Sequence, residues 1–143
     1  MLAAKLAIVK VGGNSEVELN EKKDRVEDAI CATKAAIKEG VVAGGGIALI
    51  NAATSIKAKS SEEELVLEAL YYPCKTIMKN AGIEYKDIGK KNHGVNVENG
   101  KTVNMFKAGI IDPVLVTKSA LKNAASVAST ILSTNCVMSN VRG

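Results

Sequence analysis

The longest helical period in the chain lies in residues 20–39. Apolar and small side chains recur there every three or four positions, which predicts a long amphipathic helix. Asn20 is a plausible N-cap, and Gly40 is the kind of residue that ends a helix. The predicted inner face consists of Val26, Ala29, Ile30, Thr33, Ala36 and Ile37.

Three further helices are predicted downstream. The first covers residues 47–56. The second follows a capping box, formed by Ser60 with Glu63 or by Ser61 with Glu64, and runs toward Asn80; Pro73 should kink or split it. The last begins after Asp112-Pro113, which would provide a cap and an N1 proline. Its apolar residues surround much of the helix between positions 120 and 131, so we expect it to be buried on several sides.

The β signals are short. Residues 6–11 and 16–19 have strand-like patterns, and residues 136–138 could form a closing strand. Residues 95–103 predict a hairpin with a type I′ turn at Asn99-Gly100. The expected fold class is therefore mostly α with small β elements (α+β).

Composition adds that the core is built from small side chains. The chain has 143 residues and is 47% hydrophobic, but aromatic residues make up only 3%. A chain of this size hides only about two-thirds of its unfolded surface. A core poor in large residues is then marginal, which suggests that a partner surface is missing.

Charge and cysteine content exclude several classes of function. The net charge of +4 is scattered and lacks interleaved aromatic residues, so nucleic-acid binding is not expected. Three distant cysteines and a single histidine argue against a disulfide framework or a zinc site. No apolar run reaches the roughly 18 residues of a membrane span, and the first residues lack the layout of a signal peptide.

The glycine run Gly44–Gly46 is the first candidate for chemistry. Glycines before a helix let backbone amides approach a ligand, and the helix N-terminus favours anions or nucleotides. The run is neither a Walker A loop nor a G-x-G-x-x-G motif. Tight backbone packing is the alternative interpretation, and isolated glycine motifs more often reflect it.

Three polar residues are further candidates, each with a structural alternative. Asp112 either caps the last helix or places a carboxylate beside the hydroxyls of a ligand. Asn96, in the hairpin, either reads the edge of an adenine or serves the turn. Asp28, near Asp24 and Arg25, either belongs to a solvated charged face or is presented to a neighbouring site, where it positions a water.

Several blocks of sequence closely resemble the GroEL family of group I chaperonins. They occur in the family's order and cover most of the chain, which makes the match highly specific. The blocks are Glu21–Ala29, Ala32–Ala36, Glu39–Gly46, Gly109–Pro113, Val116–Leu121 and Ala124–Ala128.

The resemblance implies a two-part organisation. Residues 1–39 are similar to the returning part of the intermediate domain, and residues 40–143 to the C-terminal half of the equatorial domain. In the family the equatorial domain binds ATP with magnesium and makes most ring contacts. A helical equatorial bundle with a β-hairpin is thus expected beside a partial intermediate domain.

The resemblance also assigns roles to individual residues. The family's catalytic Asp, delivered by the intermediate domain, falls on Asp28. Its apolar contact with the base falls on Ile110. The remaining nucleotide contacts fall on Gly45, Asn96, Val97, Glu98 and Asp112.

The family's other ATP-binding elements have no counterpart here. Its Gly-Asp-Gly-Thr-Thr phosphate loop, its magnesium-binding Asp and its apical domain lie outside the matching blocks. The stretch before Asn96 and the opening region around Leu6 look shorter than in the family, and Val97 replaces a smaller residue. We therefore expect no metal ligands in this chain and little ATPase activity from it alone.

The implied function is part of an ATP-dependent chaperone that encloses non-native proteins and assists their folding. Its partners would be other subunits of a heptameric ring, with a co-chaperonin and unfolded clients bound through the apical domain. It would act in the bacterial cytoplasm or in an organelle matrix such as that of mitochondria. The alternatives are a small nucleotide-binding enzyme that uses Gly44–Gly46 and a purely structural assembly module.

Overall fold

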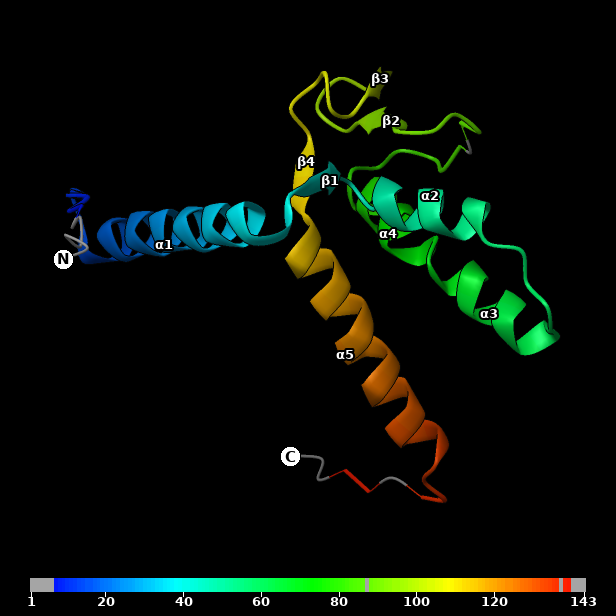
Figure 1. The fold of residues 1–143 in the computed structure, drawn as a ribbon. Coiled ribbons are helices and arrows are strands. Elements are labelled where there is room, and N and C mark those ends of the chain that lie inside the picture. The colour runs from blue at the N-terminus through cyan, green and yellow to red at the C-terminus, as the bar shows by residue number, and fades with distance from the viewer. Residues whose placement is uncertain (1–6, 87, 137, 140–143) are drawn as a thin grey trace, which may run out of the picture.

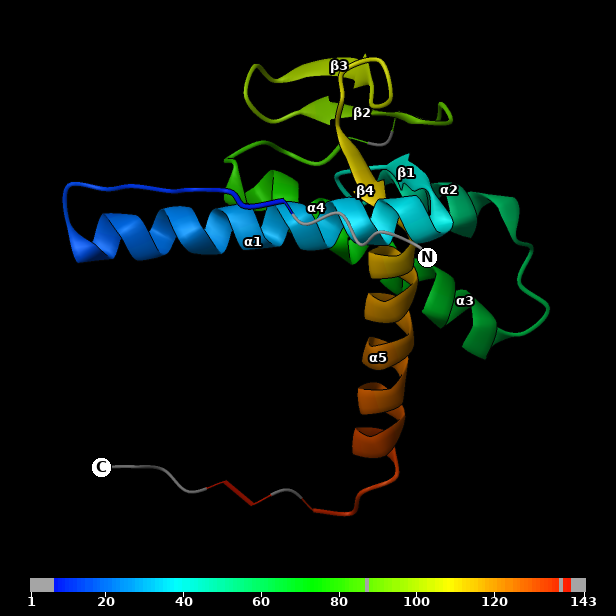
Figure 2. The same cartoon turned by 60° about the vertical axis from the view of Figure 1, so that its left-hand side comes forward.

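The computed structural model describes residues 7–86, 88–136 and 138–139. Its elements radiate from a short pair of strands (Figure 1). One long helix projects from this pair as an arm, and a second leaves it in another direction. The three shorter helices and a β-hairpin pack together on the remaining side, and a turned view shows the same separation (Figure 2). The mostly helical α+β class predicted from the sequence is confirmed.

The arm is helix α1, Glu16–Glu39. It begins earlier than predicted, because Ser15 rather than Asn20 is the N-cap and its hydroxyl accepts a hydrogen bond from the Glu18 amide. The Glu18 carboxylate accepts in return from the Asn14 amide at 2.9 Å. The strand expected at residues 16–19 is therefore wrong: these two capping bonds make those residues the first helical turn. The strand expected at residues 6–11 is also not formed over its described part, residues 7–11.

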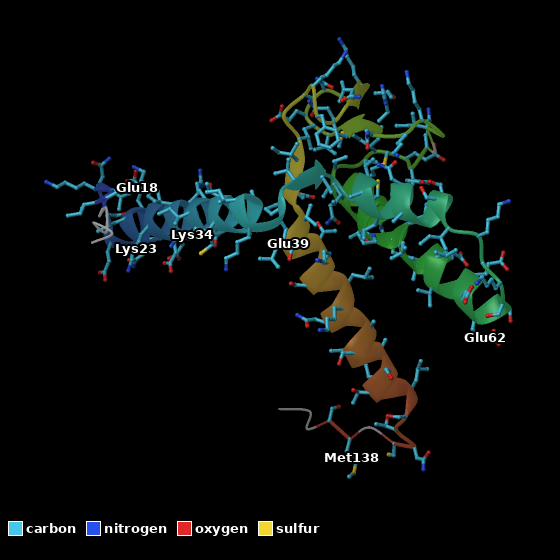
Figure 3. All side chains as sticks on the ribbon, in the orientation of Figure 1. Glu18, Lys23, Lys34, Glu39, Glu62 and Met138 are labelled. Atoms are coloured by element: carbon cyan, nitrogen blue, oxygen red, sulfur yellow. The ribbon has the colours of Figure 1, made fainter. Side chains whose placement is uncertain are left out.

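The predicted inner face of α1 is largely solvent-exposed. Ile30 is 40% exposed and Ile37 is 80% exposed, whereas Ala35 is the buried residue of this helix. Gly40 ends the helix as predicted, with a φ of 83°. Near that end the Glu39 carboxylate pairs with the Lys118 ammonium at 2.7 Å. Figure 3 shows Glu39 at the end of α1 next to the rest of the molecule and Glu18 at the far end.

The central strands are β1, Val41–Ala43, and β4, Ile111–Pro113, which pair antiparallel. The patterns in the sequence do not predict this pair. It changes the role of Asp112, which lies in β4 opposite Val42 instead of capping a helix. Helix α5, Val114–Leu132, starts after Pro113, which occupies the N-cap position with extended backbone.

The shorter helices agree well with the sequence. Helix α2 spans Ile47–Ser55, α3 spans Ser61–Ala69 and α4 spans Tyr72–Asn80. The split between α3 and α4 falls just before Pro73, as predicted. Of the two proposed capping boxes, the structure forms the one with Ser60 as N-cap, whose hydroxyl accepts from the Glu63 amide.

The hairpin is also present, with strands β2, His93–Asn96, and β3, Lys101–Asn104. Its turn differs from the prediction. Asn96 pairs with Lys101, so four residues form the loop, and of these Gly100 alone has a positive φ, of 67°. A type I′ turn requires a positive φ at both central residues, so that assignment was wrong.

The core lies where α2, α4 and the hairpin meet. Its buried residues are Ala43, Ile47, Cys74, Met78 and Met105. Helix α5 lies outside this core and has no buried residue, which contradicts the burial predicted for it. The predicted closing strand is also absent at Cys136 and Met138, and Val137 lies outside the described residues.

Candidate functional site

The glycine run forms a tight turn between β1 and α2. The Gly44 amide donates to the Ile110 carbonyl at 3.0 Å, and the Ile47 amide donates back to the Gly44 carbonyl at 3.2 Å. Gly45 and Gly46 have φ values of 65° and 77°, in the region that glycine adopts without strain. The turn thus joins the end of β1 to the N-terminus of α2 and fixes the approach of Ile110.

Two of these glycines are needed for close packing. A Cβ on Gly46 would lie 2.8 Å from the Cys74 amide nitrogen, and one on Gly44 would lie 3.2 Å from the Ile110 carbonyl carbon. The packing interpretation therefore applies to both. At Gly45 the nearest atom is the flexible end of the Met105 side chain, 3.0 Å away. This glycine faces a cavity, not a neighbouring backbone.

That cavity, called the inner cavity below, has a volume of about 170 Å³. Three residues singled out in the sequence, Gly45, Val97 and Ile110, line it together. The other lining residues are apolar or weakly polar: Ile47, Cys74, Ile77, Met78, Val95 and Met105. Burial raises the pKa of the Cys74 thiol, which favours the neutral form and keeps this wall uncharged.

Helix α4 also contributes to this cavity, although none of its residues was a candidate from the sequence. Cys74, Ile77 and Met78 come from one face of that helix. Their i, i+3, i+4 spacing is the pattern that places side chains on one helical face, so it could have identified them. It would not have indicated which residues of the hairpin they meet.

Asn96, the last residue of β2, and Glu98, in the hairpin loop, flank Val97 but do not line the inner cavity. The Asn96 side-chain oxygen accepts from the Glu98 amide at 3.0 Å, and its backbone carbonyl accepts from the Gly100 amide at 2.8 Å. These bonds are those of an Asx turn, the structural alternative for Asn96. They leave the side-chain NH₂ group of Asn96 as the available donor.

Asp112 borders a different space. It lines a larger groove of about 820 Å³ between β4, α5 and the shorter helices. Its side chain is half-buried, and its carboxylate forms no hydrogen bond with any other residue in the described part of the chain. The structure thus separates Asp112 from the residues of the inner cavity.

Asp28 is exposed in the middle of α1. Its neighbour Arg25 pairs with Glu21 one turn earlier, so it is not committed to Asp28. Because α1 projects away from the strand pair and the hairpin (Figure 1), the structure does not bring Asp28 to the inner cavity.

The described residues contain no cluster of three or more His, Cys, Asp or Glu side chains that could hold a metal ion. None of their helices is long and apolar enough to cross a membrane.

Comparisons with known proteins agree with one another. A family model described as "TCP-1/cpn60 chaperonin family" matches residues 1–142. "Chaperonin homolog Hsp-60, mitochondrial" of Caenorhabditis elegans is 46% identical over 154 residues, covering 98% of this chain and 27% of the relative. A crystal structure of a group III chaperonin in the open state matches with a TM-score of 0.73 and 24% identity, over 90% of this chain and 30% of that one. The chain thus spans about a quarter of the length of its curated relative (27%).

Proposed function

Because this chain belongs to the TCP-1/cpn60 chaperonin family, we propose that it is the C-terminal part of a subunit of an ATP-driven protein-folding chaperone. In this proposal, residues 1–39 contribute to the intermediate domain and residues 40–143 to the equatorial domain. The division falls at Gly40, which ends α1 with a positive φ and has open space around its Cα. Glycine at that point allows α1 to change direction relative to β1 at low cost.

The observation that carries the nucleotide-binding proposal is the convergence of Gly45, Val97 and Ile110 on the inner cavity. The cavity walls are apolar, as the flat faces of a purine base require, and ligand sites are commonly built this way with few polar groups. Asn96 and Glu98 flank Val97, which lines the cavity, so the backbone there and the Asn96 amide could read the edge of the base.

Two other features would serve the sugar and the phosphates. The N-terminus of α2 follows Gly46 directly, and its partial positive charge favours an anion there. Asp112 has a carboxylate with no partner among the described residues, which suits it to accept hydrogen bonds from ribose hydroxyls. Asp112 lines the groove and not the inner cavity. In this proposal the nucleotide therefore reaches from the inner cavity, which holds its base, to the groove, where Asp112 meets its ribose.

The residues present fit the base end of ATP but not its magnesium. No metal-ligand cluster exists among the described residues, so the cation would be held by other parts of the subunit. When bound, magnesium would neutralise charge on the phosphates. The part assigned to this chain is Asp28, whose exposed carboxylate would orient the attacking water after α1 swings toward the cavity.

Partners and location are proposed on the same basis. The exposed apolar side chains of α5 and the open groove beside it support burial against further parts of a ring subunit or its neighbours. A co-chaperonin and unfolded client proteins would bind elsewhere on the subunit. The mitochondrial relative favours an organelle matrix over the bacterial cytoplasm.

Substituting Ile110→Glu in the protein that carries this chain tests the nucleotide site. A carboxylate in the apolar inner cavity should raise the Kd for ATP by about tenfold or more, because an unpaired buried charge is costly. The control is Ile111→Glu, one residue later, where the side chain is 45% exposed and lines neither space. Equilibrium binding of ATP should be measured on both. Unchanged affinity in a folded Ile110→Glu variant would mean that the inner cavity is only a packing defect.

A further inference from the structure

A second cavity, called the basic cavity below, lies on the other side of α2 from the groove. It has a volume of about 200 Å³ and is enclosed by α2, α4 and the segment 85–95 that precedes and enters the hairpin. Four residues, Ile47, Cys74, Met78 and Val95, line both this cavity and the inner cavity, so they form the wall between the two. The nucleotide-site residues proposed above do not line it.

The segment that closes the basic cavity is fixed near both of its ends. At its start, the Tyr85 ring lies 5.6 Å from the ammonium of Lys75 on α4, a cation–π distance. At its end, the Asn51 side-chain NH₂ group donates to the Asn92 side-chain oxygen at 2.8 Å, and the Asn92 amide donates to the Asn51 side-chain oxygen at 3.3 Å. These contacts tie the segment to α4 and α2, so the cavity is a defined space.

Positively charged side chains gather around the basic cavity. Lys86, Lys90 and Lys91 line it, together with His93. None of its lining residues in the described part of the chain is acidic, and none of the three lysines forms an ion pair with a described residue. The His93 Nδ1 atom lies 2.9 Å from the Lys91 carbonyl oxygen, so this nitrogen donates there and the lysine ammonium groups are the donors left for an anion.

We propose that the basic cavity binds a small oxyanion of the size and charge of inorganic phosphate. Its volume equals that of about seven water molecules at liquid density, enough for a phosphate with part of its hydration. Lysine ammonium groups bind phosphate as point charges, and three of them can adjust to one anion because their stems are flexible. The site is separate from the proposed nucleotide site and does not depend on it.

Equilibrium dialysis with radiolabelled inorganic phosphate tests the proposal on the protein that carries this chain. Ionic strength is held constant with chloride, and ADP is present in excess to fill any nucleotide site. We expect saturable binding, and a Kd raised about tenfold or more in the double variant Lys90→Gln, Lys91→Gln, since two charge-assisted contacts are lost.

Two matched variants distinguish binding in the basic cavity from a general effect of charge. Lys57→Gln with Lys59→Gln removes the same charge from an exposed linker that lines no cavity and should leave the Kd unchanged. Lys90→Arg with Lys91→Arg keeps the charge and should retain binding. Three outcomes overturn the proposal: no saturable binding under these conditions, equal losses in the two glutamine variants, or binding that appears only when ADP is omitted.

Discussion

Gly46 shows at the scale of one residue how the glycine run is constrained. Its φ of 77° and the 2.8 Å approach of the Cys74 amide to a would-be Cβ leave no room for a side chain. Gly46→Ala should lower the free energy of unfolding by about 1–3 kcal/mol, from backbone strain and forced displacement of α4. Gly100→Ala is the control, because its φ is 67° but no atom lies within 4 Å of the added Cβ. Denaturant unfolding should show the larger loss at Gly46; equal losses would contradict the close packing of α2 on α4.

Asp28 tests the catalytic proposal at the same scale. An exposed carboxylate that reaches the nucleotide only after closure contributes to the transition state more than to ground-state binding. Asp28→Ala in the protein that carries this chain should leave the Kd for ATP nearly unchanged and slow single-turnover hydrolysis by about 100-fold.

The matched control for Asp28 is Asp24→Ala, one turn earlier on α1 and similarly exposed. It should affect neither quantity. Equal effects of the two substitutions on hydrolysis, or a large loss of affinity in Asp28→Ala, would make Asp28 a structural residue or an ordinary ligand contact.

At the scale of elements, local signals in the sequence were reliable where a single residue restricts its own backbone. Pro73 splits α3 from α4 and Gly40 ends α1, both as predicted. The same local chemistry explains one error. The alternating residues 16–19 resemble a strand, but the Ser15 hydroxyl accepts from the Glu18 amide and the Glu18 carboxylate accepts from the Asn14 amide, and these bonds start a helix there.

Pairings over long distances in the sequence were not predictable. The β1–β4 pair joins residues about 70 positions apart along the chain, and each strand is too short for periodicity to show. Because β4 gives no signal of its own, the position of Asp112 just before the last helix predicted a helix cap there. Among the candidate site residues, the convergence of Gly45, Val97 and Ile110 depends on this pair and on the hairpin. Sequence and family resemblance selected those residues, but only the three-dimensional arrangement separates them from Asp112 and Asp28.

The cap of α3 provides a test at this scale. Ser60→Ala should lower the free energy of unfolding by about 1 kcal/mol, because the Glu63 amide loses its acceptor. Ser61→Ala is the control, since Ser61 is the first helical residue and alanine suits a helix at least as well. Thermal or denaturant unfolding should show a loss for the first substitution only. The opposite order would mean that the cap lies at Ser61, with Glu64 as its partner.

At the scale of the whole molecule, the chain exposes surface that a self-sufficient domain of this size would bury. Helix α5 has no buried residue, and its apolar side chains Val127, Ile131 and Leu132 are 59%, 58% and 86% exposed. The groove beside it, about 820 Å³ in volume, is lined mainly by Ala, Val, Leu and Ile side chains. The apolar stripe of α1 is exposed as well. The prediction that α5 is buried on several sides was therefore wrong for this chain, while its apolar circumference fits a helix that is covered in a larger assembly.

The isolated 143-residue chain should consequently self-associate or behave as a loosely packed state. Apolar patches larger than a few hundred Å² favour association, and α5 with its groove offers such a patch next to a small core. Sedimentation velocity should show species larger than the monomer that grow with concentration, or an expanded monomer that binds a hydrophobic dye. Leu121→Lys with Ala128→Lys, both lining the groove, should reduce association, whereas Lys122→Glu, outside it, should not. A compact, dye-negative monomer with a sharp melting transition would contradict the prediction, because it would show that the exposed helices need no further surface to cover them.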